Sequence, residues 1–125
     1  DGVAVDPNGK DLIVNLLEKE KTRLVRIPLS GGPGQEILVQ GDLPIVPIPL
    51  GGNAIRKDGK ILIGVNPRDS WFFSLAVLDP ATGNLSGIPL NYTGDILLSG
   101  WGSDGRILAV GEPMRARLWR FRRLP

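Results

Sequence analysis

Three aspartates are the residues of this sequence whose types and spacing could do chemistry. Asp6, Asp58 and Asp104 stand at repeat-turn positions of three similar segments. Carboxylates at equivalent places could bind a metal ion or act as the acid and base of a glycosidase. Turns require the same residue types, because an Asp or Asn oxygen accepts hydrogen bonds from the backbone that follows it. We therefore favour turn formation, and we expect no catalytic residue, no metal site and no cofactor.

The residues that are missing limit the remaining chemistry. The chain contains no Cys and no His. Their absence excludes disulfides, thiolate and imidazole metal ligands, and any proton relay through His within this chain. The glycine-rich segment Gly31–Gly34 is not a phosphate loop, because no Lys followed by Ser or Thr comes after it.

A cluster of basic and aromatic residues is the first candidate binding site. Its members are Arg115, Arg117, Trp119, Arg120, Arg122 and Arg123. Such a cluster could hold an anionic partner through charge pairing and stacking. The interpretation we favour is a strand near the outer side of a sheet, whose charges prevent pairing with another chain. The net charge is only +2 and its basic excess lies at this end, so we expect no nucleic-acid partner.

Aromatic residues supply two further candidates. The run Trp71–Phe73 could line a pocket or an interface, although we favour packing between sheets at the start of a strand. Trp101 lies between Gly100 and Gly102, where small residues allow strands to converge. Trp101 could therefore stack on a ligand or pack at that point of convergence.

The elements that position these residues follow from a repeat. The segments Val3–Val14, Asn53–Gly64 and Gly100–Val110 each consist of a short strand, an Asn-Gly or Asp-Gly turn with a basic residue, and an apolar strand. The turn glycines Gly9, Gly59 and Gly105 are spaced 50 and 46 residues apart. Repeats of this length are typical of β-propellers and related arrays. A two-residue turn with positive φ at both central positions would explain the turn composition.

Each unit continues beyond this hairpin. A third strand is expected at 24–29, 75–80 and 118–121, and a weaker outer strand at 35–39 and 85–90. The strand after each turn is apolar on both faces, which predicts that both faces are covered. The charged stretch Glu18–Thr22 is expected to be a hairpin tip, although a helix over Leu12–Arg26 is the competing interpretation. The sequence thus predicts an all-β chain of about two and a half propeller blades, each a four-stranded antiparallel sheet, over residues 1–46, 47–97 and 98–125.

The motifs also resemble a known group of proteins. The stretch Arg26–Gly32 is similar to the third-strand ending of TolB-like bacterial propellers, which are loosely akin to WD-repeat proteins, and Ser103–Arg106 is similar to their hairpin turn. The resemblance spans essentially the whole chain. It implies a non-catalytic recognition module that binds a protein, a peptide or a small ligand within a longer bacterial regulatory or envelope protein, in the periplasm or the cytoplasm. The alternative is the propeller part of a larger hydrolase similar to prolyl oligopeptidases.

The number of blades raises the question of partners. Propellers close with about four to eight blades, so an open stack would leave two apolar faces and an edge strand in water. We expect the remaining blades of a longer parent protein or a second copy of this chain to cover them. No apolar run is long enough to cross a membrane, and no signal peptide is visible at the first residues.

Overall fold

The protein consists of β-strands and turns. A computed structural model describes residues 2–19, 21–41, 43–46 and 50–120, and these residues contain nine strands and no helix. The strands are β1 (Gly2–Val5), β2 (Asp11–Glu18), β3 (Lys21–Pro28), β4 (Gln35–Ile37), β5 (Ile61–Val65), β6 (Ser74–Leu78), β7 (Leu85–Gly87), β8 (Gly94–Trp101) and β9 (Ile107–Pro113). The expected all-β class is confirmed. In the described part of the chain, no helix could span a membrane.

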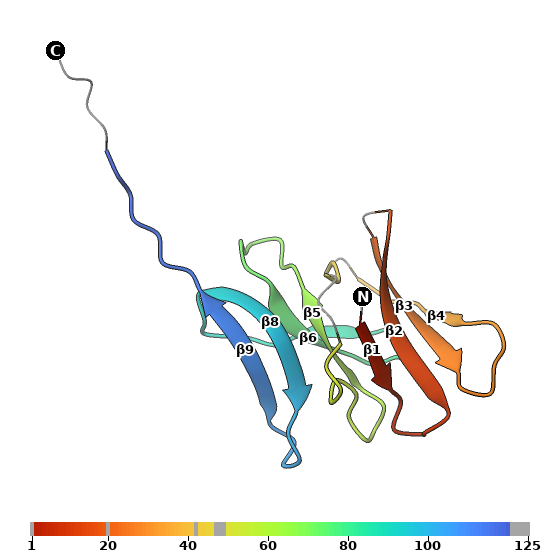
Figure 1. Ribbon diagram of the computed structural model, residues 1–125. Coiled ribbons are helices and arrows are strands. Elements are labelled where there is room, and N and C mark those ends of the chain that lie inside the picture. The colour runs from red at the N-terminus through yellow and green to blue at the C-terminus, as the bar shows by residue number, and fades with distance from the viewer. Residues whose placement is uncertain (1, 20, 42, 47–49, 121–125) are drawn as a thin grey trace.

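The strands form three antiparallel sheets that lie side by side (Figure 1). Sheet A has the order β1-β2-β3-β4, sheet B the order β5-β6-β7, and sheet C pairs β8 with β9. Sheet B lies between the other two. Of the three, sheet A alone has the expected four strands, and the described strands form no closed sheet. The two outer strands, β4 and β7, are each shorter than expected.

The segment that could have been a helix is a hairpin. Strand β2 ends at Glu18 and β3 begins at Lys21, and their pairing extends from Asp11↔Pro28 to Glu18↔Lys21. Lys19 has a φ of 47°, which helps to reverse the chain over this short distance. The prediction of a charged hairpin tip is confirmed, because strand pairing of the apolar flanks outweighs the helix propensity of Leu, Glu and Lys.

The three repeat turns share one hydrogen-bond pattern, although the first turn is one residue longer, and this pattern differs from the two-residue turn that we expected. In each, the glycine N–H donates to the carbonyl three residues earlier, as Gly59 does to Arg56 at 2.8 Å. Gly9, Gly59 and Gly105 all have positive φ, whereas none of the preceding Asn or Asp residues does. This is a type I turn followed by a left-handed glycine. The expectation was wrong because the Asn or Asp side chain acts through a hydrogen bond and leaves its own φ negative.

That hydrogen bond is the same in all three turns. Oδ1 of Asn8, Asp58 and Asp104 accepts from the backbone N–H two residues later, at 2.7, 3.4 and 3.0 Å. Asn8 is therefore the first-turn counterpart of Asp58 and Asp104. Asp6 occupies a different position, at the base of its turn.

The inner edge of sheet B is shared by two segments. Ile45 pairs with Val65, and Ile55 pairs with Ile61, both in antiparallel fashion. One continuous strand cannot make both pairs, because the register of Ile55↔Ile61 would place residue 51, and not Ile45, opposite Val65. The chain therefore leaves the edge of β5 and returns to it. The expected inner strand near Ile55 is therefore reduced to an isolated bridge.

Sheet C lacks the third strand that we expected at 118–121. Residues 118–120 form no strand, Leu118 is fully exposed, and Phe121 lies outside the described residues. The chain leaves β9 after Pro113 and runs away from the sheets (Figure 1). Nothing between Met114 and Arg117 favours a reversal, because Gly, Asn, Asp and Pro are all absent there. We call residues 114–120 the arm.

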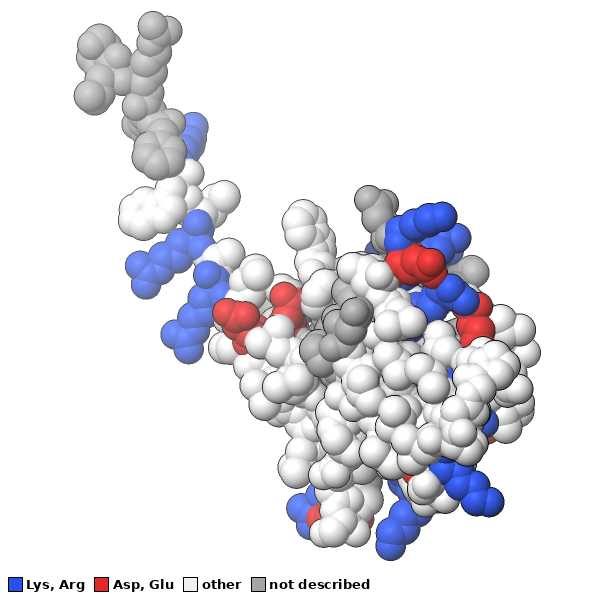
Figure 2. All heavy atoms as spheres, turned by 45° about the vertical axis from the view of Figure 1, so that its right-hand side comes forward, with Lys and Arg blue, Asp and Glu red and all other residues white. Residues whose placement is uncertain are grey.

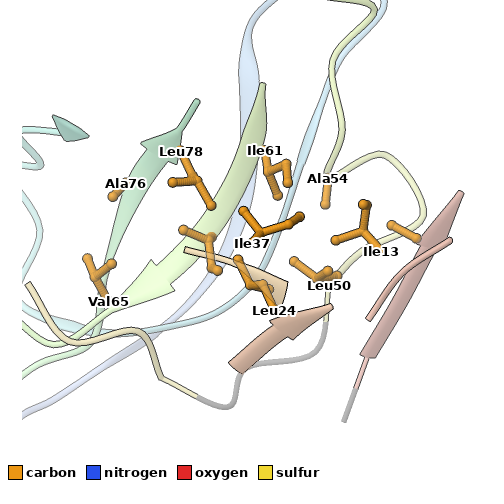
Figure 3. Packing of buried hydrophobic residues seen from close by; sticks show 11 residues of the cluster. Ile13, Leu24, Ile37, Leu50, Ala54, Ile61, Val65, Ala76 and Leu78 are labelled. Atoms are coloured by element: carbon orange, nitrogen blue, oxygen red, sulfur yellow. The ribbon is translucent and has the colours of Figure 1, made fainter. Parts of the chain in front are cut away.

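Two apolar clusters hold the three sheets together. The larger cluster joins sheet A to sheet B, and Figure 3 shows Ile13, Leu24 and Ile37 meeting Ile61 and Leu78 between the sheets. The smaller cluster joins sheet B to sheet C. It consists of Leu62, Leu75 and Ile96, against which Trp101 and Ile107 pack. Sheet B is therefore the centre of the core.

The prediction that both faces of each post-turn strand are covered holds fully for β5, in part for β2 and not for β9. All five residues of β5 are buried. In β2, Ile13 and Val14 point to opposite faces and are both buried, although Val3 and Val5 on the neighbouring strand β1 are exposed. In β9, Leu108 and Val110 are exposed. The prediction was wrong for β9 because sheet C has a neighbour on one side only within the described chain.

Candidate recognition site

The structure places the predicted basic cluster on the arm. Arg115, Arg117, Trp119 and Arg120 are exposed there, whereas Arg122 and Arg123 lie outside the described residues. Figure 2 shows the basic atoms of the arm standing off the body of the molecule. None of these described residues lines the pocket described below. They are far from Trp101, because the arm leaves the β8–β9 hairpin at Pro113 and Trp101 lies at the other end of that hairpin, beside its turn.

Trp101 joins sheet C to the inner edge of sheet B. Its backbone N–H donates to the carbonyl of Asn53 at 2.9 Å, and its indole N–H donates to the carbonyl of Ala54 at 3.1 Å. The guanidinium of Arg56 lies 4.8 Å from the ring centroid, a cation–π distance. Of the two hypotheses for Trp101, this geometry favours packing, because both its polar group and one ring face already have partners.

The three aspartates are each paired with an arginine. Asp58 contacts Arg56 at 2.6 Å, Asp104 contacts Arg106 at 2.9 Å, and Asp6 contacts Arg26 at 3.5 Å. Hydrogen bonds from Arg56 lower the pKa of Asp58 from its ordinary 3.8 to about 2. The carboxylate of Asp58 is therefore a poor proton donor at neutral pH. In the described residues, no group of acidic side chains could hold a metal ion.

The aromatic run Trp71–Phe73 lies in the loop between β5 and β6. Oγ of Ser70 accepts from the N–H of Phe72 at 3.0 Å, which closes a small turn with Trp71 at its apex. Trp71 is 96% exposed, so its expected packing between sheets was wrong. The turn directs it outward before β6 begins at Ser74.

Phe72 and Phe73 instead line a pocket of about 330 Å³. The β5–β6 loop supplies one wall and the segment between β7 and β8 supplies the other. The other lining residues are Pro67, Asp69, Ser70, Ser74, Pro89, Leu90, Tyr92, Gly94 and Ile96. The hypothesis that this aromatic run lines a pocket therefore applies to its last two members.

Hydrogen bonds and close packing fix the walls of this pocket. The N–H of Phe73 donates to Oδ1 of Asp95 at 2.8 Å, and the N–H of Ile96 donates to the carbonyl of Phe73 at 3.2 Å. The ring of Tyr92 lies against Gly111, where a Cβ atom would be 2.7 Å from it. These contacts hold the two walls of the pocket together, and the pocket is open to solvent in the described structure.

The chemistry of the pocket suits an apolar side chain with a polar neighbour. Aromatic, proline and leucine residues make up six of the eleven lining residues, and polar atoms, including those of Asp69 and Ser70, present the larger part of the exposed pocket surface. Pockets of this kind bury an anchor residue of a partner, while a few polar groups fix its orientation. The lining contains no paired carboxylates and no activated nucleophile.

The second wall was missed by sequence reasoning. Pro89, Leu90 and Tyr92 follow a three-residue strand, and no repeat or motif connects them with the β5–β6 loop. The six-residue connection from β7 to β8 contains one Pro and one Tyr, which is no distinctive signal in the sequence. Their proximity to Phe72 depends on the packing of sheet C against sheet B.

The chain was compared with known proteins in three ways. No family model matches it, and it matches no curated protein and no solved structure.

Proposed function

We propose that this chain is a non-catalytic recognition module built from consecutive blades of a β-propeller, and that it binds an extended peptide segment of a partner protein. The three sheets support the propeller assignment, since their turns share one hydrogen-bond pattern and they lie side by side in chain order. The period of the turn glycines and the likeness to TolB-like propellers support it as well.

The observation that carries the binding proposal is the aromatic pocket between the β5–β6 loop and the β7–β8 connection. Phe72, Phe73 and Tyr92 present ring surface there, and the exposed Trp71 stands beside it on the same loop. Exposed Trp and Tyr at a pocket rim are the residue types that dominate binding energy at interfaces. The carboxylate of Asp69 favours a Lys or Arg next to the apolar or proline anchor of the peptide.

Selection from a phage-displayed library of random dodecapeptides tests this proposal. We expect enrichment of peptides in which an apolar or proline residue is adjacent to Lys or Arg. Calorimetry with the best synthetic peptide should then show at least a tenfold weaker Kd for Leu90→Asp, because a carboxylate in the pocket wall opposes burial of the anchor. Trp71→Ala should weaken binding about tenfold through loss of the adjacent ring.

Two substitutions outside the pocket serve as matched controls. Leu29 and Trp119 are both exposed and line no described pocket. Leu29→Asp and Trp119→Ala should leave the Kd unchanged. The proposal fails if no peptide is enriched, or if Leu90→Asp and Leu29→Asp bind the selected peptide equally well.

A further inference from the structure

The inference concerns the two outward faces of the stack, and it does not depend on the aromatic pocket. Within a β-strand, side chains alternate between the two faces, and cross-strand partners share a face. In sheet A, Ile13 and its partner Ala4 face sheet B. The opposite face carries a group of apolar residues, which we call the outer face of sheet A: Val3, Val5, Leu12, Val14, Leu16, Val25 and Ile27. The ion-paired Glu18, Arg23 and Glu36 lie on the same side of the sheet.

The corresponding surface at the other end of the stack belongs to sheet C. Trp101 and Ile107 face sheet B. Leu98 and its partner Val110, together with Leu108, lie on the opposite side, which we call the outer face of sheet C. Leu108 is 68% exposed and Val110 is 58% exposed. In the described part of the chain, no further sheet covers either outer face, although Val14 itself is buried.

The turns relate these faces to the interfaces inside the molecule. The first strand pair beyond each turn is Val5↔Leu12 in sheet A, Ile55↔Ile61 in sheet B and Trp101↔Ile107 in sheet C. In sheets B and C this pair packs against the preceding sheet. The corresponding pair in sheet A, Val5↔Leu12, therefore lies on the face against which a preceding sheet would pack.

The next residue along each strand that follows a turn points to the other face of its sheet. Ile13 packs on sheet B and Leu62 packs on sheet C, so each contacts the sheet that follows. Leu108 occupies the same position in sheet C and has no following sheet to contact. The outer face of sheet C is thus the matching partner of the outer face of sheet A.

We infer that the outer face of sheet C of one copy binds the outer face of sheet A of a second copy, which repeats the internal contact between successive sheets. The occupant is a second copy because the two faces are the two halves of an interface that the chain already forms twice. The contact is head-to-tail, so two copies can close into a ring that buries all four outer faces.

The solution mass of the full chain tests the contact. Light scattering at micromolar concentration should give twice 13.5 kDa or a larger assembly. The double variants Val3→Lys/Val5→Lys and Leu108→Lys/Val110→Lys should each give 13.5 kDa, since each lacks one half of the contact. Leu118→Lys, a fully exposed position on the arm, should keep the wild-type mass.

Mixing the two double variants distinguishes a head-to-tail contact from a symmetrical one. Each variant retains one intact half, so an equimolar mixture should form a heterodimer. Because both variants carry Lys, their altered faces repel each other and cannot account for association. Thr at the same four positions, which retains β-propensity, gives a milder set if a Lys variant loses its β signal in circular dichroism.

Three outcomes would overturn the inference. One is a wild-type chain that remains at 13.5 kDa, which would leave the faces to another occupant such as further sheets of a longer chain. A second is continued association of either folded double variant by itself. A third is a mixture that fails to associate although both variants are folded.

Discussion

The indole N–H of Trp101 donates to the carbonyl oxygen of Ala54 across the boundary between sheet C and sheet B, at 3.1 Å. This bond ties the inner edges of two sheets together at the end of the molecule where the repeat turns lie. The neighbouring Gly100 allows this close approach, because a Cβ atom at Gly100 would lie only 3.3 Å from Asn53. The stack depends on such edge contacts as well as on its apolar clusters.

Replacing the indole of Trp101 tests the contribution of this bond to stability. Trp101→Phe retains a ring but removes the donor, so the free energy of unfolding should fall by about 1 kcal/mol. Urea denaturation followed by circular dichroism measures it. Trp119→Phe, on the exposed arm, should leave the denaturation midpoint unchanged. Equal midpoints for Trp101→Phe and the wild type would show that the bond does not stabilise the stack.

Two glycines with positive φ should differ in their tolerance of alanine. Gly105 has open space around its Cα, so Gly105→Ala should cost about 1 kcal/mol from backbone strain alone. At Gly83 a Cβ atom would lie 2.5 Å from the carbonyl oxygen of Leu38. Gly83→Ala should therefore cost at least about 1 kcal/mol more, because sheet A and sheet B must separate locally.

Thermal or urea unfolding of both variants measures this difference. The carbonyl of Gly83 also accepts from the N–H of Gln40 at 2.8 Å, so the clash falls at a contact between the outer parts of two sheets. If Gly105→Ala were the more destabilising of the two, the close approach at Gly83 would be wrong.

The ion pair of Asp58 predicts a measurable titration. The hydrogen bond from Arg56 lowers the pKa of Asp58 to about 2, below its ordinary 3.8. Because the folded pKa is depressed, the stabilising contribution is complete above about pH 4 and is lost as the pH falls through about 2. Carbon-detected NMR of the carboxyl group should give a midpoint near 2 in the wild type. Arg56→Gln should return the midpoint toward 3.8, and a wild-type midpoint already near 3.8 would contradict the pairing.

The repeat made much of the fold predictable from the sequence. The positions of Gly9, Gly59 and Gly105 located all three turns, because the backbone there has a positive φ that Gly adopts most easily. This requirement depends only on the local sequence. The hairpin over Leu12–Arg26 followed from its alignment with the other units. In the described residues the third strand of the last unit is missing, because nothing between Met114 and Arg117 favours a reversal of the chain and alignment alone could not supply a turn.

The candidate site was less predictable because it depends on contacts between distant segments. The run Trp71–Phe73 could be recognised as notable, but the partial burial of Phe72 and the exposure of Trp71 depend on one Ser70 turn. Tyr92 reaches the same pocket only because sheet C packs on sheet B. The basic cluster was conspicuous in the sequence, yet its described members lie on the arm, away from any pocket.

Chemical-shift mapping of a selected peptide tests the recognition proposal most directly. A titration of the ¹⁵N-labelled chain with that peptide should shift amide signals of residues 69–74 and 92–96, which form the two walls of the aromatic pocket. The signals of the repeat turns around Gly9, Gly59 and Gly105 should not move. Shifts confined to those turns or to the arm, with residues 69–74 unchanged, would contradict the account.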